Sequence, residues 1–195
     1  PYTAGFEFAM ALYEQGGLAA VNAAWDDLPQ STEHILHPDR YLAGDVPQVV
    51  ALPPLTETLG IGWQLLEQNM FGEFYLRQYL SQQLDENSVD VAATGWGGDQ
   101  YAVYWNEADE AVTMVLRLAW DSAQDEAEFQ AIFPQYSAYL FETTNEAHPP
   151  GLDCVVGPDD VICLGQVASD SLIVRAPDVD TAVRVFEQFP DRVGD

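Results

Sequence analysis

The sequence predicts an α+β fold in which an N-terminal helical block is followed by an antiparallel sheet with helices on one face. Apolar residues recur at helical spacing through the first 84 residues, whereas alternating, β-branched runs joined by short turns dominate from Trp96 onward. In that second part the expected order is ββαβββα, and hairpin-linked strands are typical of antiparallel sheets. We therefore expect a helical block over residues 1–90 and an α+β subdomain over residues 91–195.

The helical block should contain several short helices rather than one long one. Apolar residues recur every three or four positions over residues 3–15, and Gly16-Gly17 should end that helix. Ser31 is a suitable N-cap for the next one. Further helices are expected over residues 32–36, from about Gly62 and, most strongly, over residues 71–84. The intervening residues 43–56 should be extended.

The second part should supply the sheet. Strands are expected over residues 100–106, over residues 111–120, in both arms of a hairpin around residues 157–160, and over residues 171–176. Ser122 followed by Asp125 is a variant of the capping box and should start a helix that continues to Leu140, with a kink at Pro134. A final helix should begin at Asp178.

The two cysteines lie in the hairpin. A turn over residues 157–160 places Val156 opposite Val161 and, in the same register, Cys154 opposite Cys163. Directly opposed side chains on neighbouring strands are close enough for a disulfide. The alternative is a pair of buried free thiols. A disulfide indicates an oxidising, extracytoplasmic location.

The charge of the chain is extreme and one-sided. There are 32 acidic and 6 basic residues, for a net charge of −26, and every basic residue is an arginine. Such a surface repels nucleic-acid phosphate and anionic lipid, which argues against both as partners. No apolar run is long enough to span a membrane. The chain opens at Pro1 rather than Met, so we expect a trimmed start.

The sequence offers no complete metal or nucleophile motif. His34 and His37 are three residues apart on a short expected helix, but no HExxH motif accompanies them and no third ligand can be named. The alternative role for His37 is a hydrogen bond at the helix end before Pro38. Neither GxSxG nor an activated cysteine pattern is present. We therefore predict no catalytic residue, no metal ligand and no cofactor in this chain.

Two segments are richer in functional side chains than the rest. Residues 29–41 and residues 94–101 each combine polar and aromatic residues with defined turns. If both turns line one cleft, they provide candidate cleft residues. These are Glu33, His37, Trp96 and Asp99.

A simpler interpretation accounts for the same residues. Glu33 or Asp99 pairs with Arg40 or Arg77, and Trp96 fills a gap in the core, because such packing roles are common for buried arginine pairs and aromatic residues. The sequence leaves both interpretations open.

Several stretches together resemble a known family. They are Pro1-Tyr2-Thr3-Ala4-Gly5, residues 16–21, residues 31–38, Gly72-Glu73-Phe74, residues 92–101 and Trp120-Asp121. In these stretches, over roughly its first 130 residues, the chain resembles the C-terminal part of an exported family of gluzincin-like zinc metallopeptidases of bacteria and archaea. The chain departs from the family pattern at His34, where the family has Gln, and at Gln100, where it has Arg.

The resemblance implies that the two halves of the parent protein have different roles. The family's HExxH helix and its later glutamate ligand would lie before Pro1, so zinc would belong to the parent protein and not to this chain. Residues 1–42 would pack against the metal helices, which implies that Tyr2 also lies near the cleft, together with Glu33, His37 and Asp99.

The sequence thus leads to two functional hypotheses. In the first, the chain is the non-catalytic C-terminal portion of an exported zincin-like metallopeptidase; it packs on its own N-terminal metal-binding half and shapes the cleft for a peptide substrate. In the second, it is an acidic extracytoplasmic interaction module without enzymatic activity. A third idea, adaptation of the acidic surface to high salt, predicts that stability rises with salt.

Overall fold

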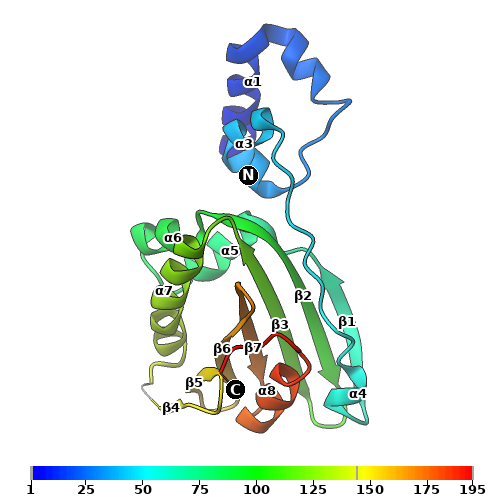
Figure 1. The fold of residues 1–195 in the computed structure, drawn as a ribbon, viewed down its shortest axis with the longest axis vertical. Helices are drawn as coiled ribbons and strands as arrows, with labels where there is room; N and C mark the ends of the chain where they lie inside the picture. Colours follow the sequence, from blue (N-terminus) through cyan, green and yellow to red (C-terminus); the bar gives the residue numbers. More distant parts are fainter. Residues whose placement is uncertain (1, 144, 195) are drawn as a thin grey trace.

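The protein consists of a small helical block joined to a larger body built on a sheet (Figure 1). The computed structural model describes residues 2–143 and 145–194, so Pro1, on which the expected trimmed start rests, lies outside them. From here on, the helical block means residues 2–43, which contain α1 (Tyr2–Ala23), α2 (Thr32–Leu36) and α3 (Pro38–Ala43). Non-helical backbone at Gly16 and Gly17 kinks α1, where the sequence predicted a helix end.

The body is a seven-stranded, fully antiparallel sheet with the order β1-β2-β3-β7-β6-β5-β4. Its strands are β1 (Trp63–Asn69), β2 (Trp96–Asn106), β3 (Ala111–Trp120), β4 (Glu146–Ala147), β5 (Leu152–Val156), β6 (Val161–Val167) and β7 (Asp170–Ala176). The α+β class, with helices preceding an antiparallel sheet, is confirmed.

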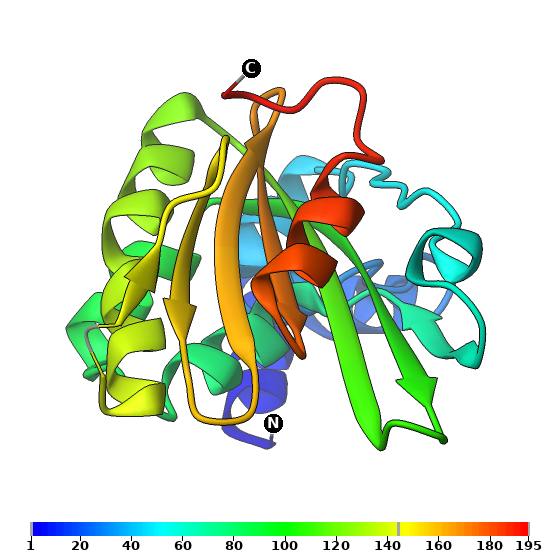
Figure 2. The ribbon, with the colours of Figure 1, turned by 90° about the horizontal axis from the view of Figure 1, so that it is seen from below.

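Helices cover both faces of this sheet, and the expectation of helices on one face is corrected (Figure 2). One face carries α5 (Gly72–Leu80), α6 (Glu86–Ala93) and α7 (Ala123–Phe141), and the other carries α4 (Thr56–Leu59) and α8 (Val179–Phe186). The reason lies in the central strands. Val115 of β3 enters the core beneath α8, whereas its neighbour Leu116 enters the core beneath α7. Strands that are apolar on both sides need cover on both sides.

The structure also corrects the expected elements between residues 62 and 93. Residues 63–69 form β1 instead of a helix, because they pair along β2 from Trp63 opposite Asn106 to Asn69 opposite Tyr101. The helix expected over residues 71–84 ends at Leu80, and α6 follows as a helix that the sequence pattern did not reveal. Pairing with a distant strand has overridden local propensity here.

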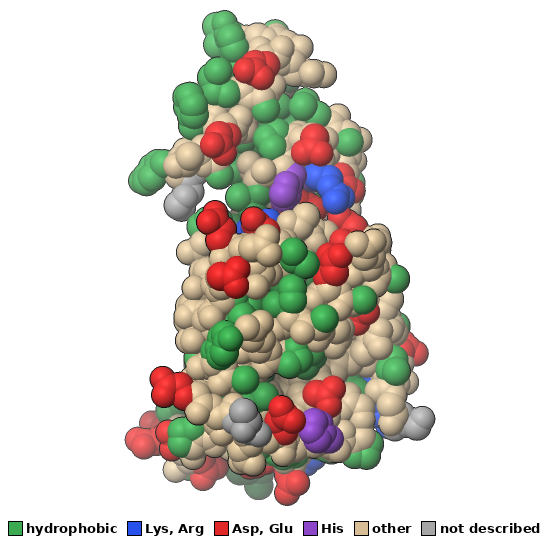
Figure 3. All heavy atoms as spheres, turned by 90° about the vertical axis from the view of Figure 1, so that its left-hand side faces the viewer, with side chains coloured by type: hydrophobic (Ala, Val, Ile, Leu, Met, Phe, Trp, Pro, Cys, Tyr) green, Lys and Arg blue, Asp and Glu red, His purple; other side chains and the backbone are tan. Residues whose placement is uncertain are grey.

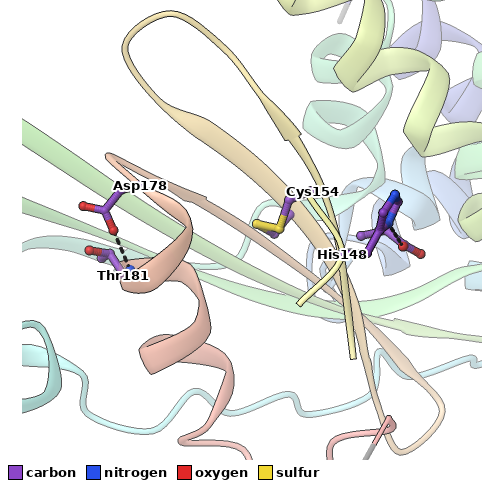
Figure 4. The surroundings of a disulfide bond; sticks show 6 residues. His148, Cys154, Asp178 and Thr181 are labelled. Atoms are coloured by element: carbon purple, nitrogen blue, oxygen red, sulfur yellow. Dashed lines mark hydrogen bonds and ion pairs between the residues drawn. A yellow bond between two sulfur atoms is a disulfide. The ribbon is translucent and has the colours of Figure 1, made fainter. Parts of the chain in front are cut away.

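The cysteine hairpin has the predicted register. Val156 lies opposite Val161 and Cys154 lies opposite Cys163, and the two cysteines form a disulfide. Figure 4 shows this disulfide with the start of α8 at Asp178 on one side and His148 on the other. Both cysteines are buried in the core beneath α8. None of the helices in the described part of the chain is both long and apolar enough to cross a membrane.

Candidate functional site

A buried polar cluster lies where the helical block meets the body. It forms because α2 rests against the start of α5. Thr32 Oγ1 accepts a hydrogen bond of 3.1 Å from the backbone N–H of Phe74. Gly72 has a positive φ of 76°, and a Cβ there would lie 2.7 Å from Thr32 Oγ1, so this close approach requires glycine.

Glu73 is the centre of the cluster. Its side chain is 1% exposed, and Oε1 lies 2.9 Å from His37 Nε2 and accepts a 2.7 Å hydrogen bond from Arg77 Nε. The other oxygen, Oε2, is buried and has no hydrogen-bond partner among the described residues. The hydrogen bond to Glu73 raises the pKa of His37 above its usual value, although burial opposes that shift.

Glu33 of α2 is a second buried carboxyl group in this contact region between the helical block and the body, which we call the joint. It is 3% exposed, and its nearest cation is Arg40, whose Nη1 is 3.9 Å from Glu33 Oε1. Burial, followed by the negative charge of Asp121, raises the pKa of Glu33 to about 7. Glu33 is therefore a group that can exchange a proton near neutral pH.

Arg40 connects Glu33 to two further carboxylates. Its guanidinium pairs with Asp45 at 3.1 Å and with Asp121 on the loop after β3. Single oxygens of Glu33, Asp45 and Asp121 lie within 4.8 Å of one another, a spacing that could hold a metal ion. However, Arg40 already pairs with all three and supplies the positive charge that an ion would bring. We therefore assign no metal to this group.

Asp99 and Trp96 organise the start of α5 from the adjoining end of β2. Asp99 accepts hydrogen bonds from the backbone N–H groups of Phe71 and Gly72, both at 2.6 Å, and from Trp96 Nε1 at 2.7 Å. Burial raises the pKa of Asp99, and these three hydrogen bonds oppose the shift. Asp99 thereby fixes the helix from which Glu73 projects.

The predicted site residues are thus only partly gathered. Glu33 and His37 lie in the joint, and Trp96 and Asp99 lie behind it as its support, whereas Tyr2 is 95% exposed on α1. The predicted pairing of Glu33 with Arg40 is present at 3.9 Å, while Asp99 bonds to backbone and Trp96 instead of an arginine.

The sequence did not identify Glu73 and Asp121 as members of the cluster, and it offered Arg77 as a partner of Glu33 or Asp99, whereas Arg77 pairs with Glu73. Glu73 and Arg77 are four residues apart in one helix, a spacing that favours an ion pair and could have identified them. No comparable local signal marks Asp121, which reaches the joint only because β3 ends there.

A second feature of the helical block is its exposed apolar surface. Figure 3 shows hydrophobic side chains gathered on the block. We call these residues the N-terminal apolar surface: Tyr2, Phe6, Met10, Tyr13, Leu18, Trp25 and Leu28. Their exposed fractions range from 39% for Met10 to 95% for Tyr2. Large exposed apolar patches mark interaction surfaces in many proteins.

Comparison with known proteins places the sheet in a family. The family model described as a domain of unknown function (DUF8575) matches residues 63–186, which is more than half of the chain. The match begins at β1 and ends at α8, so it includes Glu73, Arg77 and Asp99 but leaves Glu33 and His37 outside. No curated protein and no solved structure matches the chain. The chain therefore belongs to the DUF8575 family, whose matched region is the β1–α8 body to which the helical block is joined.

Proposed function

We propose that this chain is the non-catalytic C-terminal portion of an exported zincin-like protein, in which it packs on a metal-binding half and helps to shape the substrate cleft. The observation that carries the proposal is the N-terminal apolar surface. The resemblance of residues 1–42 to segments that follow the metal helices of zincin-like proteins supplies the identity of the partner.

The two sides of α1 support a role in docking. On one side, Phe8 and Leu12 are buried, and the Phe8 ring packs edge-on against Tyr41 with centroids 5.2 Å apart. On the other side, Phe6 is 65% and Tyr13 is 50% exposed. Large apolar side chains exposed on the side away from a buried face are typical of an interaction surface. The exposed side is therefore the surface we assign to the metal-binding half.

The buried cluster would lie behind that docking surface, since α2 contacts both α1 and α5. Its side chains do not form a zinc site of their own. His37 is bonded to Glu73, which also holds Arg77, and the Glu33 group is paired with Arg40. Zinc sites use three or four converging donors with no cation among them. The proposal therefore assigns zinc to the partner half and a shaping role to this cluster.

The same proposal includes an extracytoplasmic location. The Cys154–Cys163 disulfide is compatible with it, because such bonds persist mainly in oxidising compartments.

Zinc content and peptidase activity of the purified chain test the non-catalytic part. We expect substoichiometric zinc after dialysis and no turnover of a denatured protein substrate. Stoichiometric zinc or sustained turnover would refute this part of the proposal.

The docking part is tested in the complete reading frame. An HExxH motif encoded upstream is expected, and the separately produced upstream half should bind this chain. Phe6→Ser with Tyr13→Ser should weaken that binding at least tenfold, whereas Val112→Ser, at a 48% exposed position on β3, should not. Equal effects of the two variants would contradict docking through α1.

The alternative function, an acidic extracytoplasmic interaction module without enzymatic activity, uses the same apolar surface for a separate partner. A signal peptide directly preceding the first residue, with no HExxH motif in the gene, would favour this alternative.

A further inference from the structure

The two edges of the sheet are protected very differently. At one edge, β4 is only two residues long and is soon followed by Pro149-Pro150. At the other, β1 extends over seven residues and, among the described residues, pairs only with β2 (Figure 1). Exposed edge strands present unpaired backbone N–H and C=O groups, and proteins usually block them with proline, charge or short length.

β1 has few of these protective features. Its sequence, Trp-Gln-Leu-Leu-Glu-Gln-Asn, contains no proline and one charge, and all residues after Trp63 are exposed. That charge, on Glu67, accepts a 2.7 Å hydrogen bond from the Tyr101 hydroxyl of β2. A single register shift between Leu65 and Glu67 is the remaining protection. The outer edge is therefore open to strand addition.

Apolar side chains and a cavity border this edge. Leu65 is 46%, Leu66 62% and Ile61 102% exposed. At the end of β1, a cavity of about 460 Å³ lies between residues 46–50 of the connecting segment and residues 68–70. An extended peptide paired along β1 could use its backbone for affinity and place a terminal side chain in this cavity.

Charge decides which extended segment fits. The chain carries −26, and Arg40, Arg77, Arg117 and Arg175 are all engaged in ion pairs with acidic side chains. A second copy would bring the same negative charge to the edge, whereas a cationic peptide is attracted. We propose that the outer edge of β1 binds an extended, positively charged peptide by β-strand addition. This inference holds whether or not the chain is part of a zincin-like protein.

Fluorescence anisotropy with two labelled peptides tests the proposal. The probe is Arg-Val-Arg-Val-Arg-Val-Arg, and the control is Arg-Val-Arg-Pro-Arg-Val-Arg, which has the same charge but cannot pair continuously as a strand. We expect the probe to bind the full chain at least tenfold more tightly than the control at 0.15 M salt. Equal affinities would mean that only charge is recognised and would overturn the proposal.

A pair of variants locates the binding. Leu66→Lys places a blocking charge on β1, and Val193→Lys makes the same charge change at a 47% exposed position near the C-terminus. Leu66→Lys should lower probe affinity at least fivefold more than Val193→Lys, with both variants retaining the native circular dichroism spectrum. Equal losses would overturn the assignment to β1. So would dimerisation in light scattering that Leu66→Lys abolishes, because the occupant would then be a second copy.

Discussion

Glu33 and His37 respond to pH in the same direction, although one is an acid and the other a base. The pKa of Glu33 is raised to about 7, so the folded chain holds this proton more tightly than the unfolded chain, and stability falls as pH rises from about 4.5 to 7. The pKa of His37 is raised by Glu73, so its contribution is fully present below about 6.5 and is lost as pH rises through the folded value. The charges of Asp45, Asp121 and Arg40 also face this joint.

This reasoning predicts that the protein is more stable at pH 6 than at pH 8. Glu33→Gln carries no charge at either pH, so it should be more stable than the native chain at pH 8 by about 1–2 kcal/mol and nearly equal to it at pH 5. Chemical denaturation across this pH range measures both differences. His37→Gln is the control, because it should lose stability chiefly at pH 6. Parallel pH profiles for the native chain and Glu33→Gln would contradict the buried-acid interpretation.

At the scale of elements, the connection between helical block and body depends on two glycines of β2. The extended segment before α4 lies directly on β2, where the Gln48 backbone N–H donates a 2.7 Å hydrogen bond to the Gly97 carbonyl. A Cβ at Gly98 would lie 2.3 Å from the Gln48 carbonyl oxygen, far inside normal contact distance. Glycine is therefore needed here because another backbone passes so close.

Gly98→Ala should accordingly destabilise the protein by about 1–3 kcal/mol, since the segment must shift away from β2. Gly5→Ala is the matched control. Gly5 lies within α1 and a Cβ there meets nothing within 4 Å, so alanine should be neutral or stabilising by about 0.5–1 kcal/mol. Urea denaturation of both variants checks the difference. If Gly98→Ala had the same free energy of unfolding as the native protein, the segment could move away from β2 without loss of stability, which would contradict this prediction.

For the whole molecule, the dominant property is self-repulsion. A net charge of −26 on 195 residues opposes the compact state at low ionic strength, and only a few arginines offset it. At 0.1 M salt, exposed charges more than about 10 Å apart are largely screened from one another, and this distance becomes shorter at higher salt concentration.

We therefore expect the Tm to rise between 0.1 and 2 M NaCl. A gain of about 2 kcal/mol would raise the Tm of a protein of this size by about 4–8 °C. Differential scanning calorimetry measures the shift, and sucrose is the control because it strengthens burial without screening charge. A Tm that rises equally in sucrose and NaCl would show that charge repulsion is not the cause.

In the candidate site, residues close together in the sequence could be predicted, whereas their distant partners could not. Glu33 and His37 could be selected because they lie together in one short polar segment. Their principal partners could not, since Glu73 is 36 residues from His37 and Asp121 lies on another element altogether. The partners of Asp99 could not be predicted locally either, because two of the hydrogen bonds it accepts come from backbone N–H groups 27 and 28 residues away.

The sequence by itself determined the α+β class, the register of the cysteine hairpin and the cap at Ser122, which accepts a hydrogen bond from the Asp125 backbone N–H. These features depend on residues within about ten positions of one another, so local spacing and turn chemistry suffice to specify them. Only the tertiary structure decided that residues 63–69 join the sheet, that helices cover both of its faces and that Glu73 meets His37. Each of these depends on which distant surfaces bury one another, and that choice is made by the packing of the whole chain.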